Sequence, residues 1–227
     1  MARLVVAALL LSSAAIAAPD AGPPEAPRIA VLYFTAALKD PELEAFTKGL
    51  SALLISDLSA NPQLRVIERE RLEDVLAELK LGETRFADRD SFSKIGNALG
   101  AKFLLVGTLA GAHGKYRIST RLIDTSTFDD VRGMGAKVDL DPADVFAATD
   151  ALVEQLNAKL ASARSLPPPA APAKKAALPL KSAVKYSRAL DAKDKKDPAG
   201  AKKLLGEVVA EQPDFKLAQL DLLSLTR

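Results

Sequence analysis

The sequence predicts an α/β fold: a mixed five-stranded sheet, built from a parallel βαβ unit and an antiparallel meander, packs with helices and is followed by a small all-α helical module. Three observations support this fold class. The stretch "RIAVLYF" (28–34) is apolar on both faces, as buried parallel strands are. Residues 116–123 alternate between apolar and polar side chains, as half-exposed antiparallel strands do. Beyond residue 179, turn signals separate three short helical stretches.

The first half of the chain reads as strand, helix, strand and helix. After the opening strand, leucines recur at helical spacing, with Pro41 in the first turn and Asn61-Pro62 at the end. "LRVIER" (64–69) predicts a second strand parallel to the first, because a βαβ crossover joins them. An amphipathic helix follows this strand, and a shorter helix then ends at Gly100 as its C-cap.

The second half predicts the meander and a closing helix. Its strands are expected in "KFLLVGTLAG" (102–111), "YRISTRLI" (116–123) and "DDVRGMGAKVD" (129–139). Pro142 is expected to open a helix that closes the domain near Ser162.

The domain organisation follows from composition along the chain. One charge at Arg3, a short apolar run and small residues predict a signal peptide over residues 1–17, cleaved between Ala17 and Ala18. The remaining ranges are a Pro/Ala-rich leader (18–27), the α/β domain (28–163), a Pro/Ala-rich linker (164–179) and the helical module (180–227). Because its own helices can cover both faces of the sheet, the α/β domain is expected to fold without the module.

Composition narrows the classes of function. The chain has no cysteine, which excludes disulfides, thiolate metal sites and acylation as a lipoprotein. The net charge of +2 gives no indication of a nucleic-acid partner, and after signal removal no stretch is long enough to span a bilayer. The C-terminal residues 174–227 are nevertheless basic, with twelve Lys or Arg against seven acids. We expect export to the periplasm, with a peripheral position at the outer membrane as an open alternative.

Motifs for catalysis or cofactor binding are weak. "GAHGKY" (111–116) resembles a phosphate-binding loop, but a strand follows it, so a hairpin turn is expected. His113 is the single histidine and falls in that turn. The paired acids are expected to cap turns and helices rather than to bind metal; they are Asp88 with Asp90, Asp129 with Asp130, and Asp139 with Asp141. The prediction is a protein that is no enzyme, with no catalytic residue, cofactor or metal.

The stretch "VIERERLEDVLAELKLGE" (66–83) carries seven acidic and basic side chains within the eleven positions from Glu68 to Glu78. Its apolar side chains fall at i, i+3, i+4 and i+7, so the charges are expected on the solvent face of a helix. The alternative is a partner-contact surface. Its candidate residues are Arg69, Arg71, Glu73 and Asp74 in the cluster, with Arg117 and Arg121 on the outward face of the meander.

Four segments in order carry a resemblance: "IAVLYF", "RVIERERLEDVLAELKLGE", "IGNALGAKFLLVGTL" and "YRISTRLIDTST". Over residues 28–160 the chain resembles the curli secretion channel (CsgG-like) superfamily, which includes TolB amino-terminal-like and FlgO-type envelope domains. The resemblance implies a non-enzymatic α/β domain that works through protein contacts in the bacterial envelope. The chain departs from channel members in lacking their N-terminal cysteine and long membrane hairpins, which argues against a pore.

The C-terminal part resembles a single tetratricopeptide repeat through Ala201, Leu205, Val208 and Pro213, although a plain helical hairpin is an equal alternative. Together these features favour a periplasmic scaffold or adaptor with protein partners. The alternative function is an oligomeric accessory subunit of an outer-membrane secretion or flagellar assembly machine, and a homo-oligomer is accordingly left open. Neither reading identifies the partner.

Overall fold

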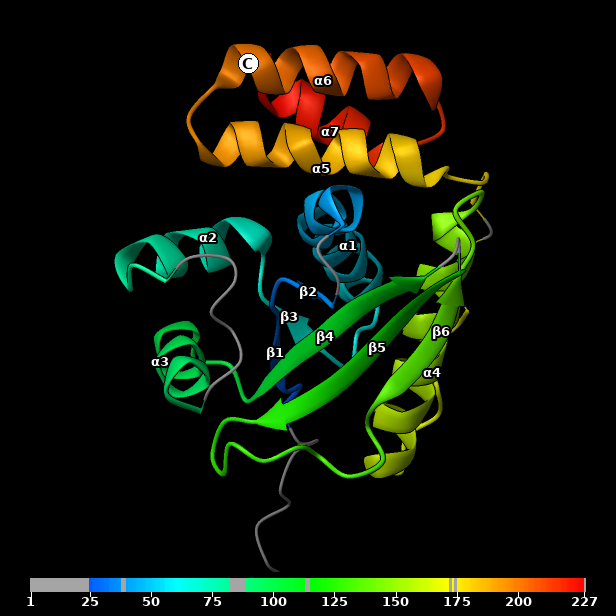
Figure 1. The fold of residues 1–227 in the computed structure, drawn as a ribbon. Coiled ribbons are helices and arrows are strands. Elements are labelled where there is room, and N and C mark those ends of the chain that lie inside the picture. The colour runs from blue at the N-terminus through cyan, green and yellow to red at the C-terminus, as the bar shows by residue number, and fades with distance from the viewer. Residues whose placement is uncertain are drawn as a thin grey trace, which may run out of the picture.

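The computed structural model describes residues 25–37, 40–81, 89–112, 115–171, 173 and 175–226. The predicted signal peptide with Ala17 and Ala18, and also Asp88 and His113, lie outside the described residues. One mixed sheet forms the centre of the molecule (Figure 1). Its strands are β1 (Arg28–Val31), β2 (Thr35–Ala36), β3 (Arg65–Val66), β4 (Phe103–Ala112), β5 (Lys115–Asp124) and β6 (Ala136–Leu140).

The sheet combines the two predicted parts. Its order is β3-β1-β4-β5-β6, with β1 parallel to β3 on one side and to β4 on the other. From β4 onward the neighbours are antiparallel, so β4, β5 and β6 form the meander. The predicted α/β class, with its βαβ unit and its meander, is therefore confirmed.

Two details of the sheet differ from the prediction. A sixth strand, β2, follows the first strand after a short break and pairs in parallel with the far end of β4. The third meander strand is shorter than expected, because it begins at Ala136 rather than near Asp129. The residues before it form turns, and Asp130 makes only an isolated bridge with Ile123.

Seven helices are described around this sheet. They are α1 (Pro41–Ser59), α2 (Arg69–Glu78), α3 (Arg89–Leu99), α4 (Val145–Ala163), α5 (Leu180–Asp194), α6 (Pro198–Glu211) and α7 (Lys216–Ser224). The cap at Asp40 accepts from the amides of Glu42 and Leu43, which fixes the start of α1. Gly100, with φ +59°, ends α3 as predicted. Pro142 precedes α4, whose cap is Asp144.

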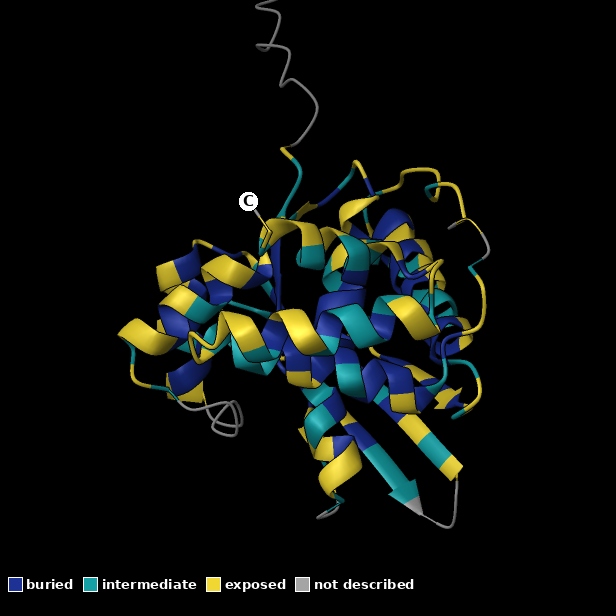
Figure 2. Ribbon diagram, turned by 90° about the horizontal axis from the view of Figure 1, so that it is seen from above, coloured by how far each residue is buried: buried dark blue, intermediate teal, exposed yellow. Residues whose placement is uncertain are grey.

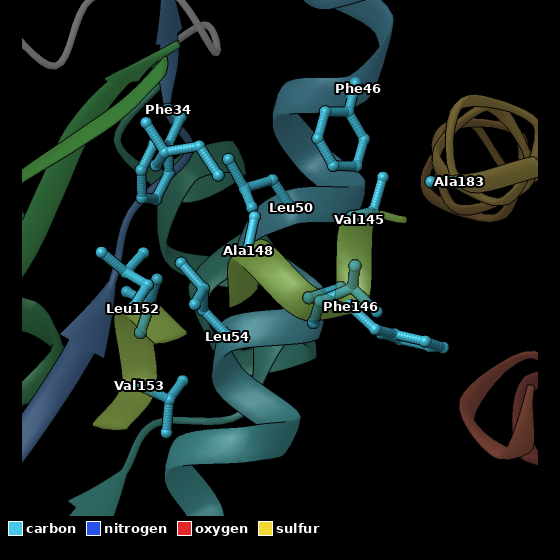
Figure 3. Close-up of a cluster of buried hydrophobic side chains, with 14 of the residues drawn as sticks. Phe34, Phe46, Leu50, Leu54, Val145, Phe146, Ala148, Leu152, Val153 and Ala183 are labelled. Atoms are coloured by element: carbon cyan, nitrogen blue, oxygen red, sulfur yellow. The ribbon is translucent and has the colours of Figure 1, made fainter. Parts of the chain in front are cut away.

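Two apolar cores lie on the two faces of the sheet. On one face α2 and α3 pack against β1 and β4, and from β5 only Ile123 contributes. The other face packs on α1 and α4, where Leu50 and Leu54 meet Ala148 and Leu152 (Figure 3). The β5–β6 half of the α2–α3 side therefore lies outside the apolar core of that face and carries exposed polar side chains.

The helical module is part of the larger core. Helix α5 lies across α1, and its Ala183 and Tyr186 belong to the same cluster of buried residues as the α1 leucines. The approach is close at Gly49, where an added Cβ would lie 2.9 Å from the Ser187 Cβ. Figure 2 looks down on this side of the molecule and shows buried residues on the inner faces of its helices.

The segment predicted as a linker also makes contacts that composition did not predict. Leu178 is fully buried, and its carbonyl accepts from the amide of Val145. Lys175 forms ion pairs with Asp57 at 2.7 Å and with Asp150 at 2.9 Å. This segment is therefore no free connection, because its charged and apolar side chains dock on α1 and α4. The domain boundaries themselves stay predictions.

Candidate functional site

Helix α2 carries the charge cluster, and the structure places its residues on two different surfaces. Leu72, Val75 and Leu76 are buried, as the apolar stripe predicted. Arg71 and Asp74 are exposed, which fits either a solvated face or a contact surface. Two further acids of the helix are exposed as well, Glu70 and Glu78.

Arg69 departs from the expected solvent face of this helix. Its side chain is only 6% exposed, and its Nη1 donates to both carboxylate oxygens of Asp194, each at 2.8 Å. Burial opposes the charge of Arg69, but the carboxylate of Asp194 outweighs it and raises the pKa of the guanidinium. Arg69 therefore binds the end of α5 within the same chain, a contact that local helical spacing could not predict.

Lys48 of α1 lies beside this pair and is also buried. Its ammonium group is 2.9 Å from Asp194, and its side chain is 5% exposed. It also lies 3.5 Å from Asp191 and 3.5 Å from Glu73. Two buried cations from the α/β domain thus meet carboxylates from α5, and together they lock the helical module onto α1 and α2.

Glu73 ties the network to the sheet. The Tyr33 hydroxyl donates to Glu73 Oε1, and the Lys48 ammonium lies over the Tyr33 ring, 5.3 Å from its centre. Burial raises the pKa of Glu73, against the hydrogen bond from Tyr33 and the charge of Lys48. Burial and the neighbouring carboxylate of Glu73 both raise the pKa of Tyr33. Glu73 is half-buried and engaged, so it differs from its exposed neighbour Asp74.

A second branch of contacts links α2, α5 and α7. Lys193 lies 3.1 Å from both Glu70 and Asp221. Tyr186 donates to Asp221 at 2.7 Å. The Tyr186 ring also packs edge-on against Phe215, which in turn packs edge-on against Phe146 of α4. The module is thus held by ionic contacts at one end of the interface and aromatic contacts at the other.

The contacts of this network hold parts of the chain together. Its charges are matched by opposite charges within the chain, and every buried side-chain polar atom of the described residues has a hydrogen-bond partner. In the same part of the chain, no group of three or more His, Cys, Asp or Glu side chains could hold a metal ion. The described helices include none that is long and apolar enough to cross a membrane.

The other two predicted site residues lie on the open half of the sheet. Arg117 donates to Asp139 on β6 at 2.8 Å, and Arg121 donates to Asp130 at 3.3 Å. Both arginines are exposed on the same face of β5. The cross-strand pairs also explain two of the carboxylates that were weighed as metal ligands. Another of these carboxylates, Asp129, pairs with Arg89.

A groove between α1 and α7 was not predicted. It consists of two adjoining cavities of about 570 and 270 Å³ that share Ser56 and Leu217. In Figure 3 the ring of Phe146 points away from Leu54 and Leu152, although Phe146 is still part of the larger core. Together with Phe215, Phe146 lines the larger cavity, and Tyr186 lines the smaller one. The aromatic contacts that hold the module therefore also form the floor of the groove.

Comparison with known families identifies the first half of the chain. Residues 12–119 match the sequence model of the family described as "Curli production assembly/transport component CsgG". The chain contains a CsgG-like region. The resemblance that the sequence motifs indicated is thereby confirmed, and this region includes β1 to β4, the helices between them and the beginning of β5.

Among solved structures, this chain is similar to the LpoB C-terminal domain from Salmonella enterica, at 14% identity and a TM-score of 0.41, covering 53% of this chain and 87% of that one. It is similar to lipoprotein GNA1162 from Neisseria meningitidis, at 18% identity and a TM-score of 0.42, covering 50% and 81%. TolB from Acinetobacter baumannii gives 13% identity and a TM-score of 0.41, covering 62% and 29%. No curated protein matches the sequence significantly.

Sequence reasoning missed Asp194, the partner of Arg69, and Lys48, which shares the same carboxylate. Lys48 carries a recognisable feature, because it is the single charged residue between Glu44 and Asp57 in a helix of leucines and small residues. A charge in such a run predicts burial with a partner. The identity of that partner, Asp194, depends on the position of α5 and has no local indication.

Proposed function

We propose that this protein is a non-enzymatic scaffold or adaptor of the bacterial cell envelope, which works in the periplasm through protein-protein contacts. The match of residues 12–119 to a family described as an assembly and transport component carries the proposal. The chemistry of the polar network agrees with it, because buried charges there join two parts of one chain.

Two exposed surfaces could bind a partner. One is the outer side of α2 with Arg71 and Asp74. The other is the open half of the sheet, where Arg117 and Arg121 stand on β5. Arg69 and Glu73, named with them at first, are engaged inside the chain and belong to the module interface instead.

Site-specific photo-crosslinking in the producing bacterium tests the proposal. A photoreactive residue at position 71 or 121 should trap an envelope protein, whereas the same residue at buried Leu54 should trap none. Fractionation in the same experiment should place the protein in the periplasm with a mature N-terminus at Ala18. A protein that stays in the cytoplasm with residues 1–17 attached, or that gives no crosslink from either surface, would overturn the proposal.

A further inference from the structure

We infer that the groove between α1 and α7 binds a short amphipathic helix of a partner protein that carries apolar residues on one face and basic residues at both ends. This inference rests on the proposed function, since it names the kind of partner that the adaptor would bind. Four properties of the groove carry it: size, lining, an exposed apolar rim and charge.

The size of the groove suits a short helix. On α1 its lining runs from Ala52 to Ala60, which is about 12 Å of helix axis, or a little over two turns. The two cavities meet at Ser56, whose side chain is exposed and makes no hydrogen bond among the described residues. Leu217 lines both cavities as well, so a segment lying in the groove would pass between Ser56 on α1 and Leu217 on α7.

The lining is apolar along its floor and polar at its ends. Leu53, Phe146, Phe215 and Leu217 line the larger cavity. Such floors favour leucine or aromatic side chains at i, i+3 or i+4 spacing, which is how amphipathic helices bind grooves. Burial raises the pKa of Asp57 at the edge of this cavity, against the pull of its partner Lys175, so this end is partly shielded from water.

The rim adds apolar surface that the chain itself leaves uncovered. Leu220 is 63% exposed and Leu223 is 57% exposed. Both lie on α7, three and six residues beyond Leu217, and stand outside the lining of the two cavities. These two are the most exposed large apolar side chains in the described part of the chain.

The charge of the lining selects a basic partner. Five carboxylates and three cations line the two cavities. Most of them are paired, but Glu68 at one end and Asp214 at the other form no ion pair among the described residues. Lys216, beside Asp214, is likewise unpaired in that part of the chain. Basic residues at both ends of a bound helix would pair with Glu68 and Asp214.

The test measures binding of a fluorescein-labelled 16-residue peptide to the purified mature chain by fluorescence anisotropy. The peptide has leucines at i, i+3, i+4 and i+7 and lysines elsewhere; its control has glutamate in place of every lysine. We expect the lysine peptide to bind at least tenfold more tightly than the glutamate peptide. Ser56→Trp should fill the groove and reduce affinity at least tenfold, whereas Ser162→Trp, at an exposed site on α4, should leave it unchanged.

Charge variants test whether the carboxylates of the groove attract the lysine peptide. Asp214→Lys and Glu68→Lys should each weaken binding severalfold, and Lys216→Glu should strengthen it. A thermal melt of each variant shows that it is folded, and Leu220→Glu on the rim serves as a second groove variant if Ser56→Trp does not fold.

Other occupants correspond to outcomes that overturn the inference. Binding that Ser56→Trp does not alter would mean surface charge attraction alone. Light scattering that finds a dimer of the wild type and a monomer of Ser56→Trp would assign the groove to a second copy of the chain. Binding to phosphatidylglycerol vesicles that Leu220→Glu abolishes, with peptide affinity unchanged, would assign the leucines to a membrane. If photo-crosslinking still traps an envelope partner when Ser56→Trp is present, the adaptor function stands and the groove assignment fails.

Discussion

Arg69 on α2 and Asp194 at the end of α5 form a buried ion pair across 125 residues of sequence, with the guanidinium Nη1 2.8 Å from each carboxylate oxygen. Lys48 shares the same carboxylate at 2.9 Å. One acidic side chain of the helical module thus compensates two buried cations of the α/β domain, which makes it the most sensitive point of the interface.

Removing that carboxylate should be costly. Asp194→Ala leaves Lys48 and Arg69 buried without their main partner, and breaking a buried pair in this way costs about 3–5 kcal/mol of unfolding free energy. Urea denaturation measures it. Asp139→Ala removes the exposed partner of Arg117 and should cost less than about 1 kcal/mol. Equal losses for the two variants would show that Asp194 is not buried in solution.

Two helical glycines should respond in opposite ways to an added methyl group, Gly49 at the contact of α1 with α5 and Gly206 in α6. Gly49→Ala should destabilise by about 1–3 kcal/mol, because its Cβ would lie 2.9 Å from Ser187 Cβ and 3.3 Å from the Ala183 carbonyl. Gly206 in α6 has nothing within 4 Å of an added Cβ, so Gly206→Ala should stabilise by about 0.5–1 kcal/mol. A neutral or stabilising Gly49→Ala would mean that the two helices are farther apart than the structure shows.

Packing and charge within α2 can be separated. Leu76 is 3% exposed, so Leu76→Ala should cost about 2–5 kcal/mol. Asp74 is exposed and has no ion pair among the described residues, so Asp74→Lys should change stability by no more than about 0.5 kcal/mol. Thermal melts of both variants measure these changes in stability. If Leu76→Ala is tolerated and Asp74→Lys unfolds the protein, the face of α2 that packs against the sheet is not the one that the structure shows.

The raised pKa of Glu73 predicts a pH dependence. The folded state binds the proton of Glu73 more tightly than the unfolded chain, whose value is near 4.5. Stability should therefore rise as pH falls through the folded pKa, with the gain complete below about 4.5. Glu73→Gln cannot gain this way, so the wild type should become more stable relative to the variant between pH 7.5 and pH 5. The opposite slope would mean that Lys48 and Arg69 hold Glu73 ionised more strongly than burial opposes it.

The isolated α/β domain, residues 28–163, is a further test. We expect it to fold around its own helices, but to be less stable than the full chain, because α1 loses the apolar contacts of Ala183 and Tyr186 on α5. Lys48 and Arg69 become hydrated in the fragment instead of pairing with Asp194. Adding residues 180–227 as a separate peptide should restore part of the loss. An identical urea midpoint for fragment and full chain would show that the module adds nothing to the core.

Most of the fold could be predicted because its elements are locally specified. The stripe of Leu72, Val75 and Leu76 marks a helix by itself, and Gly100 marks the end of another. The two-residue strand β2 could not be predicted, because its pairing depends on the far end of β4 rather than on its own sequence. The long third meander strand was an overestimate, since residues near Gly133, with φ +76°, turn instead.

The candidate site was predictable only in part. The spacing of apolar residues correctly predicts that the side chains of Arg71, Arg117 and Arg121 are exposed. It fails for Arg69, because helical position gives the direction of a side chain but not what lies beyond the helix. The groove could not be predicted for the same reason: α1 and α7 form it together, and the two helices are separated by more than 150 residues.

The separation between Lys48 and Asp194 also orders events during synthesis. At about 5–20 residues per second, the carboxylate follows the lysine by roughly 7–30 s, so the two cations of α1 and α2 exist for that time without it. During the interval they keep a surface destined for burial hydrated and mutually repulsive between neighbouring chains, as charged gatekeeper residues do beside aggregation-prone segments. The same two cations that join α1 and α2 to α5 in the folded protein thus carry charge on this surface before α5 covers it.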